Sequence, residues 1–192
     1  MKRHPRPGCH GFTAVELMIV IAILAISLSL AIPSFTELRL NALARQQQMQ
    51  WLGFLSAARA AAVKQQTWVT VCPAVNDQCT TDLNTTWYAF YDQERSLSIQ
   101  DQSQIVSMLT IPEPTRLLMY KGNTTLPYFR YRAMGTSGNL RSLTVCPDGI
   151  ANERAFHLTS THLGHIRFLE DTTGDGIVDR LHNGKRVAVH CP

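Results

Sequence analysis

The distribution of apolar and polar positions divides the chain into two unlike parts. Residues 12–35 read FTAVELMIVIAILAISLSLAIPSF, an almost unbroken apolar run. Twenty residues from Leu17 to Thr36 carry no charge, and a helix of that length spans the hydrocarbon core of a membrane, about 30 Å. Pro33 predicts a kink or an opened turn near the end of this helix. We therefore expect a transmembrane helix over 12–35.

Apolar residues continue at helical spacing beyond this run. Between residues 36 and 65 they recur at three- and four-residue steps, with glutamine and arginine between them. The Ala57–Ala62 run favours helix and leaves a thin face on which a sheet can pack closely. The pattern predicts that the helix extends over 36–65, with Arg45 and Arg59 at solvated or rim positions.

After residue 66 the period changes to the alternation of strands, with turn residues between short β-branched runs. One long helix followed by several short antiparallel strands predicts an α+β fold, in which the helix is a stalk packed on a β-rich head over 66–192. The expected strands are Thr67–Cys72, Thr86–Asp92, Ile105–Leu109, Arg116–Tyr120, Tyr128–Arg132, Ser142–Cys146, Ala155–Leu158, His165–Leu169 and Arg186–His190.

The charge of the chain is concentrated before the apolar run. Hydrophobic residues make up 45% and charged residues 17%, which excludes a disordered polyelectrolyte. The formal charge is +4, but Lys2, Arg3 and Arg6 precede the run and favour a cytoplasmic location of the N-terminus. Without residues 1–11, fifteen basic residues face fourteen acidic ones, so the net charge becomes +1. The total charge therefore does not indicate a nucleic-acid partner.

Glu16 lies inside the apolar run, where an ionised carboxylate is costly and usually functional. No small-x-small cleavage site follows the run, which argues against an ordinary secretory signal peptide. The motif Gly11-Phe12-Thr13-x-x-Glu16-Leu17 resembles the leader of type IV pilins and type II secretion pseudopilins.

The resemblance implies how the N-terminus is processed. A prepilin peptidase is expected to remove residues 1–11 by cutting between Gly11 and Phe12 on the cytoplasmic side, and then to N-methylate Phe12. It also implies that the Glu16 carboxylate meets the N-terminal ammonium of a neighbouring subunit. Such a pair fixes register in a filament, because a misplaced subunit leaves both charges buried and unpaired.

The head narrows the resemblance. The stretches ARAAAVKQQTWVTVCP, LTVCPDG and LTSTHLGHIRF are similar to the GspH/FimT/FimU group of minor pilins, and the resemblance spans essentially the whole chain. It implies a minor type IV pilin of the FimU or FimT kind that takes part in pilus assembly initiation or the tip complex. The alternatives are a DNA-binding minor pilin for natural transformation and a type II secretion pseudopilin of the GspH kind.

Location and partners follow from the same resemblance. We expect a single-pass protein of the inner membrane with a cytoplasmic N-terminus and a periplasmic head, which later enters a pilus or pseudopilus. The expected partners are the prepilin peptidase, other major and minor pilins, the inner-membrane assembly platform, membrane lipid and, in one alternative, DNA. No catalytic arrangement stands out, so neither an enzyme nor a cofactor is expected.

Two regions are candidates for DNA contact. FimT-type proteins use a Gly-Arg-x-Arg motif, and here the stretch is Gly164-His165-Ile166-Arg167, in which histidine replaces the first permanent charge. Basic residues also lie among aromatic ones between 116 and 141, a segment without an acid, although alternation along the strand equally fits a solvated face or a pilin–pilin contact. The candidate residues are Gly164, His165, Arg167, Arg130, Arg132, Arg141, Lys185 and Arg186.

Four cysteines follow the leader, which itself holds Cys9. An even number in an exported domain predicts two disulfides, with three connectivities open. Cys72 and Cys79 flank a short turn and favour a local bridge, which leaves Cys146 to join Cys191. The alternative is a zinc site that includes His190, or His162 and His165.

The segment Asp171–Asp179 places acidic residues around two glycines. Its spacing departs from the EF-hand loop and lacks the bidentate glutamate, so a hydrated acidic turn explains it as well as a calcium loop does. We expect no metal ligands outside this loop, and calcium binding by the loop itself stays an open alternative.

Overall fold

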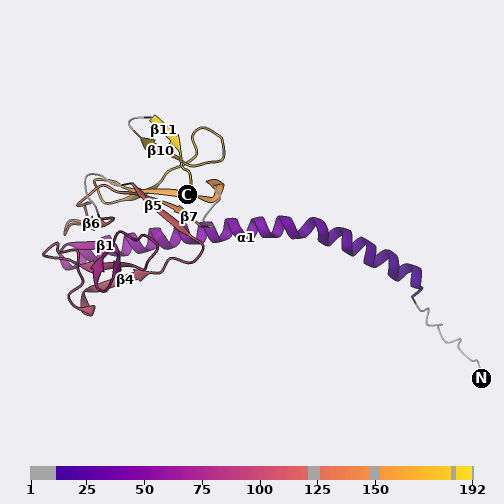
Figure 1. Cartoon of the computed structure of the whole chain (residues 1–192), viewed down its shortest axis with the longest axis horizontal. Coiled ribbons are helices and arrows are strands. Elements are labelled where there is room, and N and C mark those ends of the chain that lie inside the picture. Colours follow the sequence, from indigo (N-terminus) through magenta and orange to yellow (C-terminus); the bar gives the residue numbers. More distant parts are fainter. Residues whose placement is uncertain (1–11, 121–125, 148–151, 183–184, 192) are drawn as a thin grey trace, which may run out of the picture. The chain divides into compact units, whose positions relative to one another are not determined.

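The computed structural model describes residues 12–120, 126–147, 152–182 and 185–191, without the side chains of 29–34, 120, 181 and 182. Gly11, Cys9 and the rest of the expected leader lie outside the described residues. The chain divides into two compact units, Met1–Leu40 and Asn41–Pro192. The first unit holds the N-terminal part of helix α1 (Ala14–Gln65), and the second holds its C-terminal part and every strand (Figure 1).

Helix α1 is continuous in the described backbone, and no turn opens at Pro33. The helix ends where Gln66 adopts a left-handed conformation, φ 51°. There the amide of Thr67 donates to the carbonyl of Ala62 at 3.2 Å, which satisfies an otherwise unpaired carbonyl of the last turn. The chain then enters the first strand.

The first sheet is antiparallel and has five strands. Strand β1 is central, pairing with β3 on one side and with β6 on the other, while β4 pairs with β3 and the short β2 closes a hairpin with β1. Residues Gln102–Gln104 form a short 3-10 helix, η1, before β4. The strands are β1 (Val69–Val75), β2 (Gln78–Cys79), β3 (Trp87–Tyr91), β4 (Ile105–Leu109) and β6 (Phe129–Tyr131).

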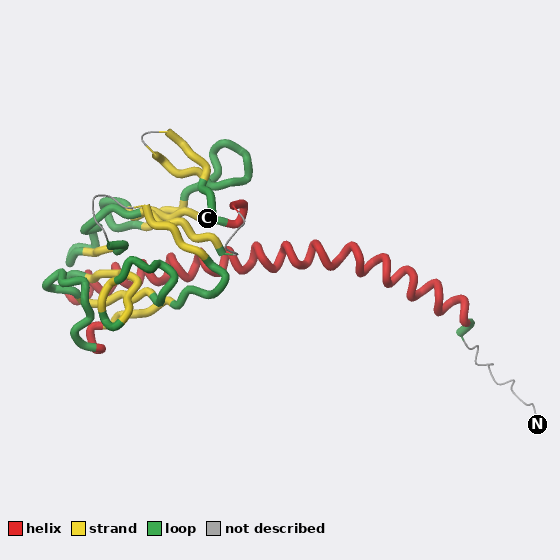
Figure 2. Tube along the Cα trace, in the orientation of Figure 1, coloured by secondary structure: helices red, strands yellow, loops and turns green. Residues whose placement is uncertain are grey.

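The second sheet has the order β5-β7-β8-β9, also antiparallel, and a separate hairpin joins β10 to β11. A second 3-10 helix, η2 (Asn152–Arg154), precedes β8. Figure 2 shows the four-stranded sheet beside the C-terminal part of α1, with the β10–β11 hairpin farther from the helix. The strands are β5 (Arg116–Tyr120), β7 (Ser142–Cys146), β8 (Phe156–Ser160), β9 (Ile166–Phe168), β10 (Asp179–His182) and β11 (Lys185–Ala188).

One hydrophobic core joins α1 to both sheets. Helical residues at three- and four-residue spacing turn one face inward, and alternate strand residues meet them, as the 3.6- and 2-residue periods require. Trp51 packs edge-on against Trp87, with ring centroids 5.1 Å apart. The core members on α1 are Trp51, Phe54, Leu55, Ala58 and Ala62. The α+β fold expected from the sequence is therefore the observed one.

Both disulfides are present, with the pairing that the cysteine spacing favours. Cys72–Cys79 closes the β1–β2 hairpin beside a small second core on the outer face of the first sheet. Cys146–Cys191 ties the C-terminal segment to β7. Because a sulfur in a disulfide cannot act as a thiolate ligand, this pairing excludes the cysteine-based zinc site.

The strand predictions agree with the structure where alternation is regular. Strands β4, β5 and β7 have the predicted bounds, and six others are shifted by one to three residues. Two strands, β2 and β10, were not expected from the sequence. The first is only two residues long, and the second follows a glycine-rich loop without β-branched alternation, so neither carries the pattern on which strand prediction depends.

His157 is the buried ionisable group of β8, and its titration gives a pH prediction. The side chain is 2% exposed and its Nδ1 lies 2.8 Å from the Thr144 hydroxyl. Burial, and then the nearby charge of Arg180, lower the pKa of His157 from 6.5 to about 4. Because the unfolded chain takes up this proton first, stability is full above pH 6.5 and falls as the pH drops toward 4.

At pH 5 the loss from this histidine should be about 2 kcal/mol relative to pH 7. Urea unfolding at both pH values measures it, in the parent chain and in His157→Gln. The pH-dependent loss should shrink by that amount in His157→Gln and stay unchanged in the control His162→Gln, since His162 is exposed. An equal pH dependence in the parent and His157→Gln would contradict the prediction.

Candidate functional site

The start of α1 carries the residues expected to direct processing and assembly. Phe12 is 83% exposed, and the helix begins two residues later. The Thr13 amide and hydroxyl each donate to the Glu16 carboxylate at 2.9 Å, and the Glu16 amide donates back to the Thr13 hydroxyl at 3.2 Å. This is a capping box, whose Thr-x-x-Glu signature is readable from the sequence but was not used in the sequence prediction.

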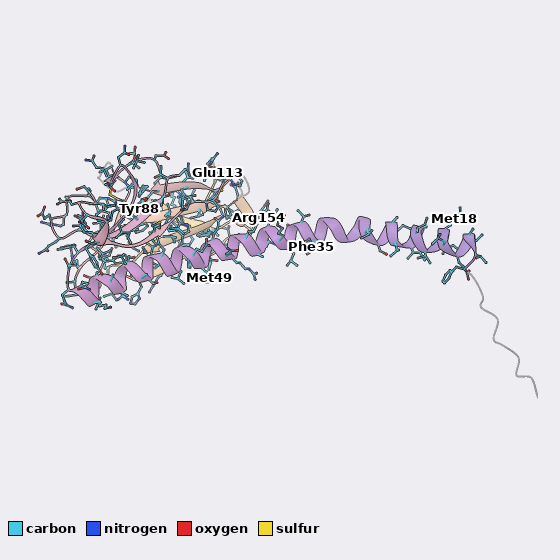
Figure 3. The ribbon with its side chains drawn as sticks, turned by 90° about the horizontal axis from the view of Figure 1, so that it is seen from below. Met18, Phe35, Met49, Tyr88, Glu113 and Arg154 are labelled. Carbon is cyan, nitrogen blue, oxygen red and sulfur yellow. A yellow bond between two sulfur atoms is a disulfide. The ribbon has the colours of Figure 1, made fainter. Side chains whose placement is uncertain are left out.

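The N-terminal part of α1 exposes apolar side chains on all of its faces. Figure 3 labels two of these residues, Met18 and Phe35, which are 66% and 69% exposed. Among the described side chains, which omit those of 29–34, no helix has both the length and the apolar character needed to cross a membrane. The large exposed apolar residues described up to residue 40 are Phe12, Val15, Leu17, Met18, Ile19, Val20, Ile21, Ile23, Leu24, Ile26, Leu28, Phe35 and Leu38.

Arg130, a candidate for DNA contact, lies in the interior of the head. It is 9% exposed, and its guanidinium donates to the Asp92 carboxylate at 2.9 Å and to the Thr70 hydroxyl at 3.0 Å. The Thr70 hydroxyl also donates to Asp92, at 2.6 Å. The alternation along β6 predicts a solvated face at Arg130, but this arginine is buried there and directs its donors to Asp92 and Thr70.

Arg141 is also withdrawn from solvent, with 5% exposure, and its guanidinium carbon lies 5.5 Å from the centre of the Tyr128 ring. The same ring contacts Arg130 at 4.8 Å. Both arginines therefore serve the interior rather than a basic outer surface. Arg132 is the one member of this group of three candidates that is exposed.

Arg132 and Arg95 share one aromatic platform. The guanidinium carbon of Arg132 lies 5.7 Å from the centre of the Trp68 ring, and that of Arg95 lies 5.6 Å from it. Both arginines are exposed, whereas the tryptophan is half-buried at the junction of α1 and β1. The sequence prediction did not include Arg95 or Trp68, because nothing in the local pattern brings residues 68, 95 and 132 together.

The stretch Gly164–Arg167 lies in the turn before β9 and in β9 itself. His165 and Arg167 are exposed, while Gly164 is buried against the turn that contains Gly135. Arg59 of α1 holds both turns, because it donates to the carbonyl of Gly135 at 2.8 Å and to that of Leu163 at 3.3 Å. Arg59 is therefore a structural clamp at the rim of the head, where a solvated or rim position is expected.

Gly164 gives a stability prediction that separates packing from backbone strain. Its φ is +77°, and an added Cβ would lie 2.0 Å from the Gly135 carbonyl oxygen. Gly164→Ala should therefore cost about 2–3 kcal/mol of unfolding free energy, since backbone atoms cannot yield as a flexible side chain does. Gly174→Ala is the matched control, with φ +79° and open space around the site. It should cost about 1 kcal/mol from backbone conformation alone.

Denaturant unfolding of the two variants compares these costs directly. Equal losses at the two positions would contradict the close approach of the 135 and 164 turns. A glycine at position 164 therefore has a structural reason that is independent of any ligand.

Lys185 and Arg186, the remaining DNA candidates, lie in β11 and are exposed. In the acidic segment Asp171–Asp179, backbone amides of the segment itself donate to a carboxylate. The Asp171 carboxylate accepts from the amides of Gly174 at 2.7 Å and Gly176 at 2.8 Å, and these bonds lower its pKa. Among the described residues, no three His, Cys, Asp or Glu side chains form a group suited to a metal ion. The geometry of the loop is thus explained by these backbone hydrogen bonds without an ion.

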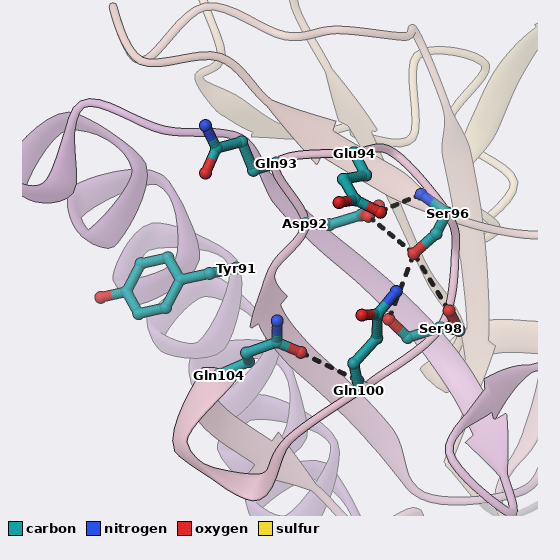
Figure 4. Close-up of a pocket in the computed structure, with 8 residues that line it drawn as sticks. All are labelled: Tyr91, Asp92, Gln93, Glu94, Ser96, Ser98, Gln100 and Gln104. Carbon is teal, nitrogen blue, oxygen red and sulfur yellow. Dashed lines mark hydrogen bonds between the residues drawn. The ribbon is translucent and has the colours of Figure 1, made fainter.

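A polar pocket of about 300 Å³ lies beside the loop that carries Arg95. Figure 4 shows hydrogen bonds from Ser96 to Asp92 and from the Gln100 amide to Gln104, with Tyr91 apart from this set. The Ser96 amide donates to the Asp92 carboxylate at 2.7 Å. These contacts stabilise the loop itself.

Comparison with known proteins adds two family matches. The protein-family model described as "Type II transport protein GspH" matches residues 47–164, and the "Prokaryotic N-terminal methylation motif" matches residues 6–32. The first match covers more than half of the chain. A search of curated proteins finds no match.

Two crystal structures of the type IV minor pilin FimU from Pseudomonas aeruginosa are similar to the chain. The form in space group P21 is 17% identical, with a TM-score of 0.48 over 69% of this chain and 90% of that chain. The form in P65 is 16% identical, with a TM-score of 0.47 over 66% and 90%. With the core, the methylation motif and the long match over the head together, the chain belongs to the GspH family of pilin-like proteins.

Proposed function

We propose that this chain is a minor pilin of the FimU or FimT kind, which helps to initiate type IV pilus assembly or forms part of the tip complex. The observation that carries the proposal is the N-terminal part of α1. Its apolar side chains are exposed on every face, and the methylation motif covers the same segment. Such a surface requires lipid before assembly and neighbouring helices after it, because apolar area left in water is unfavourable.

The proposal assigns successive roles to the first residues. Prepilin peptidase cuts between Gly11 and Phe12 and N-methylates Phe12. Before assembly, the helix anchors the subunit in the inner membrane with a cytoplasmic N-terminus and a periplasmic head. In the filament the exposed Glu16 carboxylate then meets the terminal ammonium of a neighbouring pilin, which fixes the register of the subunit. The inner-membrane assembly platform and other pilins are the partners in that step.

Complementation of a deletion strain of the source organism tests this function. Pilus number and twitching should fall on deletion, return with the parent chain and remain low with Glu16→Ala. Glu37→Ala is the matched control, because Glu37 is an exposed carboxylate on the same helix. Mass spectrometry of the purified subunit should show a methylated N-terminal Phe12. Normal piliation in the deletion strain would contradict the proposal.

A secretion pseudopilin would give a different result in the same strains. Secreted enzymes would then accumulate in the periplasm of the deletion strain while its pili remained normal. The two readouts together therefore separate the pilus function from the type II secretion alternative.

A second candidate function is contact with DNA during uptake. It is favoured by the exposed cations of the head, among them Arg132 and Arg167, although Arg130 and Arg141 do not contribute. Transformation frequency, measured in strains with normal pili, tests this function independently of assembly. An unchanged frequency in a strain that carries Arg132→Gln/Arg167→Gln and has normal pili would contradict it.

A further inference from the structure

The loop after β3, the end of α1 and the turn after β6 meet around Trp68. We propose that Arg95, Trp68 and Arg132 form a binding site for the phosphodiester backbone of a nucleic acid, outside the Gly164–Arg167 motif. The inference deepens the second candidate function and rests on it. It begins from the two guanidinium groups that lie within 5.7 Å of one indole ring centre.

Stacking on an indole leaves the donors of a guanidinium available. The attraction acts through the planar face of the group, so its N–H bonds point outward at the edge. Arg59 and Arg130 differ, since both direct donors to carbonyl or carboxylate oxygens inside the head. Among the described residues, neither Arg95 nor Arg132 has an ion pair. The platform therefore presents two oriented cations whose donors suit a phosphate.

The platform is built by the interior of the head. Gly138 lies under the ring, where an added Cβ would approach Trp68 Cζ3 to 2.9 Å. The buried Asp92 that pairs with Arg130 also accepts the amide of Ser96 at 2.7 Å, and its own carbonyl accepts the amide of Arg95 at 3.1 Å. These contacts thus hold the Trp68 ring against Gly138, and they hold the loop that carries Arg95 against Asp92.

The backbone of that loop is unusual. Arg95 has φ +59° and Leu97 has φ +61°, a left-handed region that non-glycine residues seldom occupy. Strained residues of this kind persist where the surrounding structure holds them, and they concentrate at functional positions. In this conformation the Arg95 guanidinium carbon lies 5.6 Å from the centre of the indole ring.

The surrounding charge fits an extended anion. Lys64 in the last turn of α1 is exposed, and residues 38–76 contain no acid. Glu94 is the carboxylate next to Arg95 in the sequence, and it lines the polar pocket (Figure 4). A nucleic-acid strand carries one negatively charged phosphate for each nucleotide, so two cations held on one ring can neutralise phosphates of the same strand.

Binding of a fluorescein-labelled 30-base-pair duplex to the full processed chain in detergent micelles tests the site. In Arg95→Gln/Arg132→Gln the dissociation constant should rise at least about tenfold at low salt, and the slope of log K against log salt should fall by about two. Arg39→Gln/Arg45→Gln removes the same charge from exposed positions in the middle of α1 and should change neither quantity more than twofold. Tryptophan fluorescence provides a second readout, because Trp51 and Trp87 are buried, and the DNA-induced change should disappear in Trp68→Phe.

Three results would overturn the site. One is an unchanged dissociation constant in the Arg95/Arg132 variant, and another is an equal loss in the Arg39/Arg45 control. The third is binding of polygalacturonate, a carboxylate polymer, that is as tight as DNA binding and depends equally on Arg95 and Arg132. Loss of binding in Arg167→Gln alone, with the Arg95/Arg132 variant unaffected, would reject this site while leaving the DNA function intact. Thermal unfolding and pilus number should be unchanged in the Arg95/Arg132 variant, since neither side chain enters the core.

Discussion

Replacement of Asp92 with alanine should lower the free energy of unfolding by about 3–5 kcal/mol, because it leaves the Arg130 guanidinium buried without its counter-charge. Asp92 is 3% exposed and Arg130 is 9% exposed, so water does not reach the pair to compensate. The carboxylate also accepts from Thr70 and Ser96. Removing it therefore breaks several hydrogen bonds at once.

Urea unfolding followed by tryptophan fluorescence measures the loss. The control is Glu113→Ala, which removes an exposed ion pair with Arg116. The Glu113 side chain is 76% exposed and that of Arg116 is 45% exposed. Exposed pairs contribute about 1 kcal/mol or less, so the control should change little. The double variant Asp92→Ala/Arg130→Met should regain part of the stability, since no charge then remains buried. Similar losses in Asp92→Ala and Glu113→Ala would contradict the buried-pair interpretation.

The same pair shows where sequence reasoning ends. Alternation along β6 correctly predicts that Phe129 and Tyr131 enter the core, because side-chain direction follows from the strand period alone. It does not predict that Arg130 is buried. That depends on Asp92, 38 residues earlier in the chain and directly after β3, whose carboxylate accepts from the Arg130 guanidinium at 2.9 Å. Such a contact is set by tertiary packing, which a local pattern does not contain.

The platform at Trp68 was missed for the same reason, since its three residues come from three separate segments. Arg59 is a milder case, because helical periodicity places it at the rim without identifying the two carbonyls that it binds. The helix and the regular strands were predictable because their signals lie within a few residues. Cysteine pairing was predictable for a different reason, since the short turn between Cys72 and Cys79 favours one of the three possible connectivities.

Removal of the second disulfide, in Cys146→Ala/Cys191→Ala, should destabilise the head by about 4 kcal/mol on the chain-entropy estimate. The bond closes a loop with a sequence separation of 45 residues, and it anchors the chain end to β7. The matched variant Cys72→Ala/Cys79→Ala opens a loop with a separation of only 7 and should cost about 2.5 kcal/mol. Urea unfolding of both variants under oxidising conditions gives the comparison.

The location of the loss is as informative as its size. Cys146 and Cys191 pack with Ala155 and Val189 in a small cluster apart from the main core. Hydrogen exchange in Cys146→Ala/Cys191→Ala should therefore rise most in β10 and β11, whereas β1 and β3 keep their protection, because the main core against α1 is untouched. Uniformly faster exchange across the head would mean that the C-terminal segment and the core unfold as one unit. An unchanged rate in β10 and β11 would show that the hairpin is held without the disulfide.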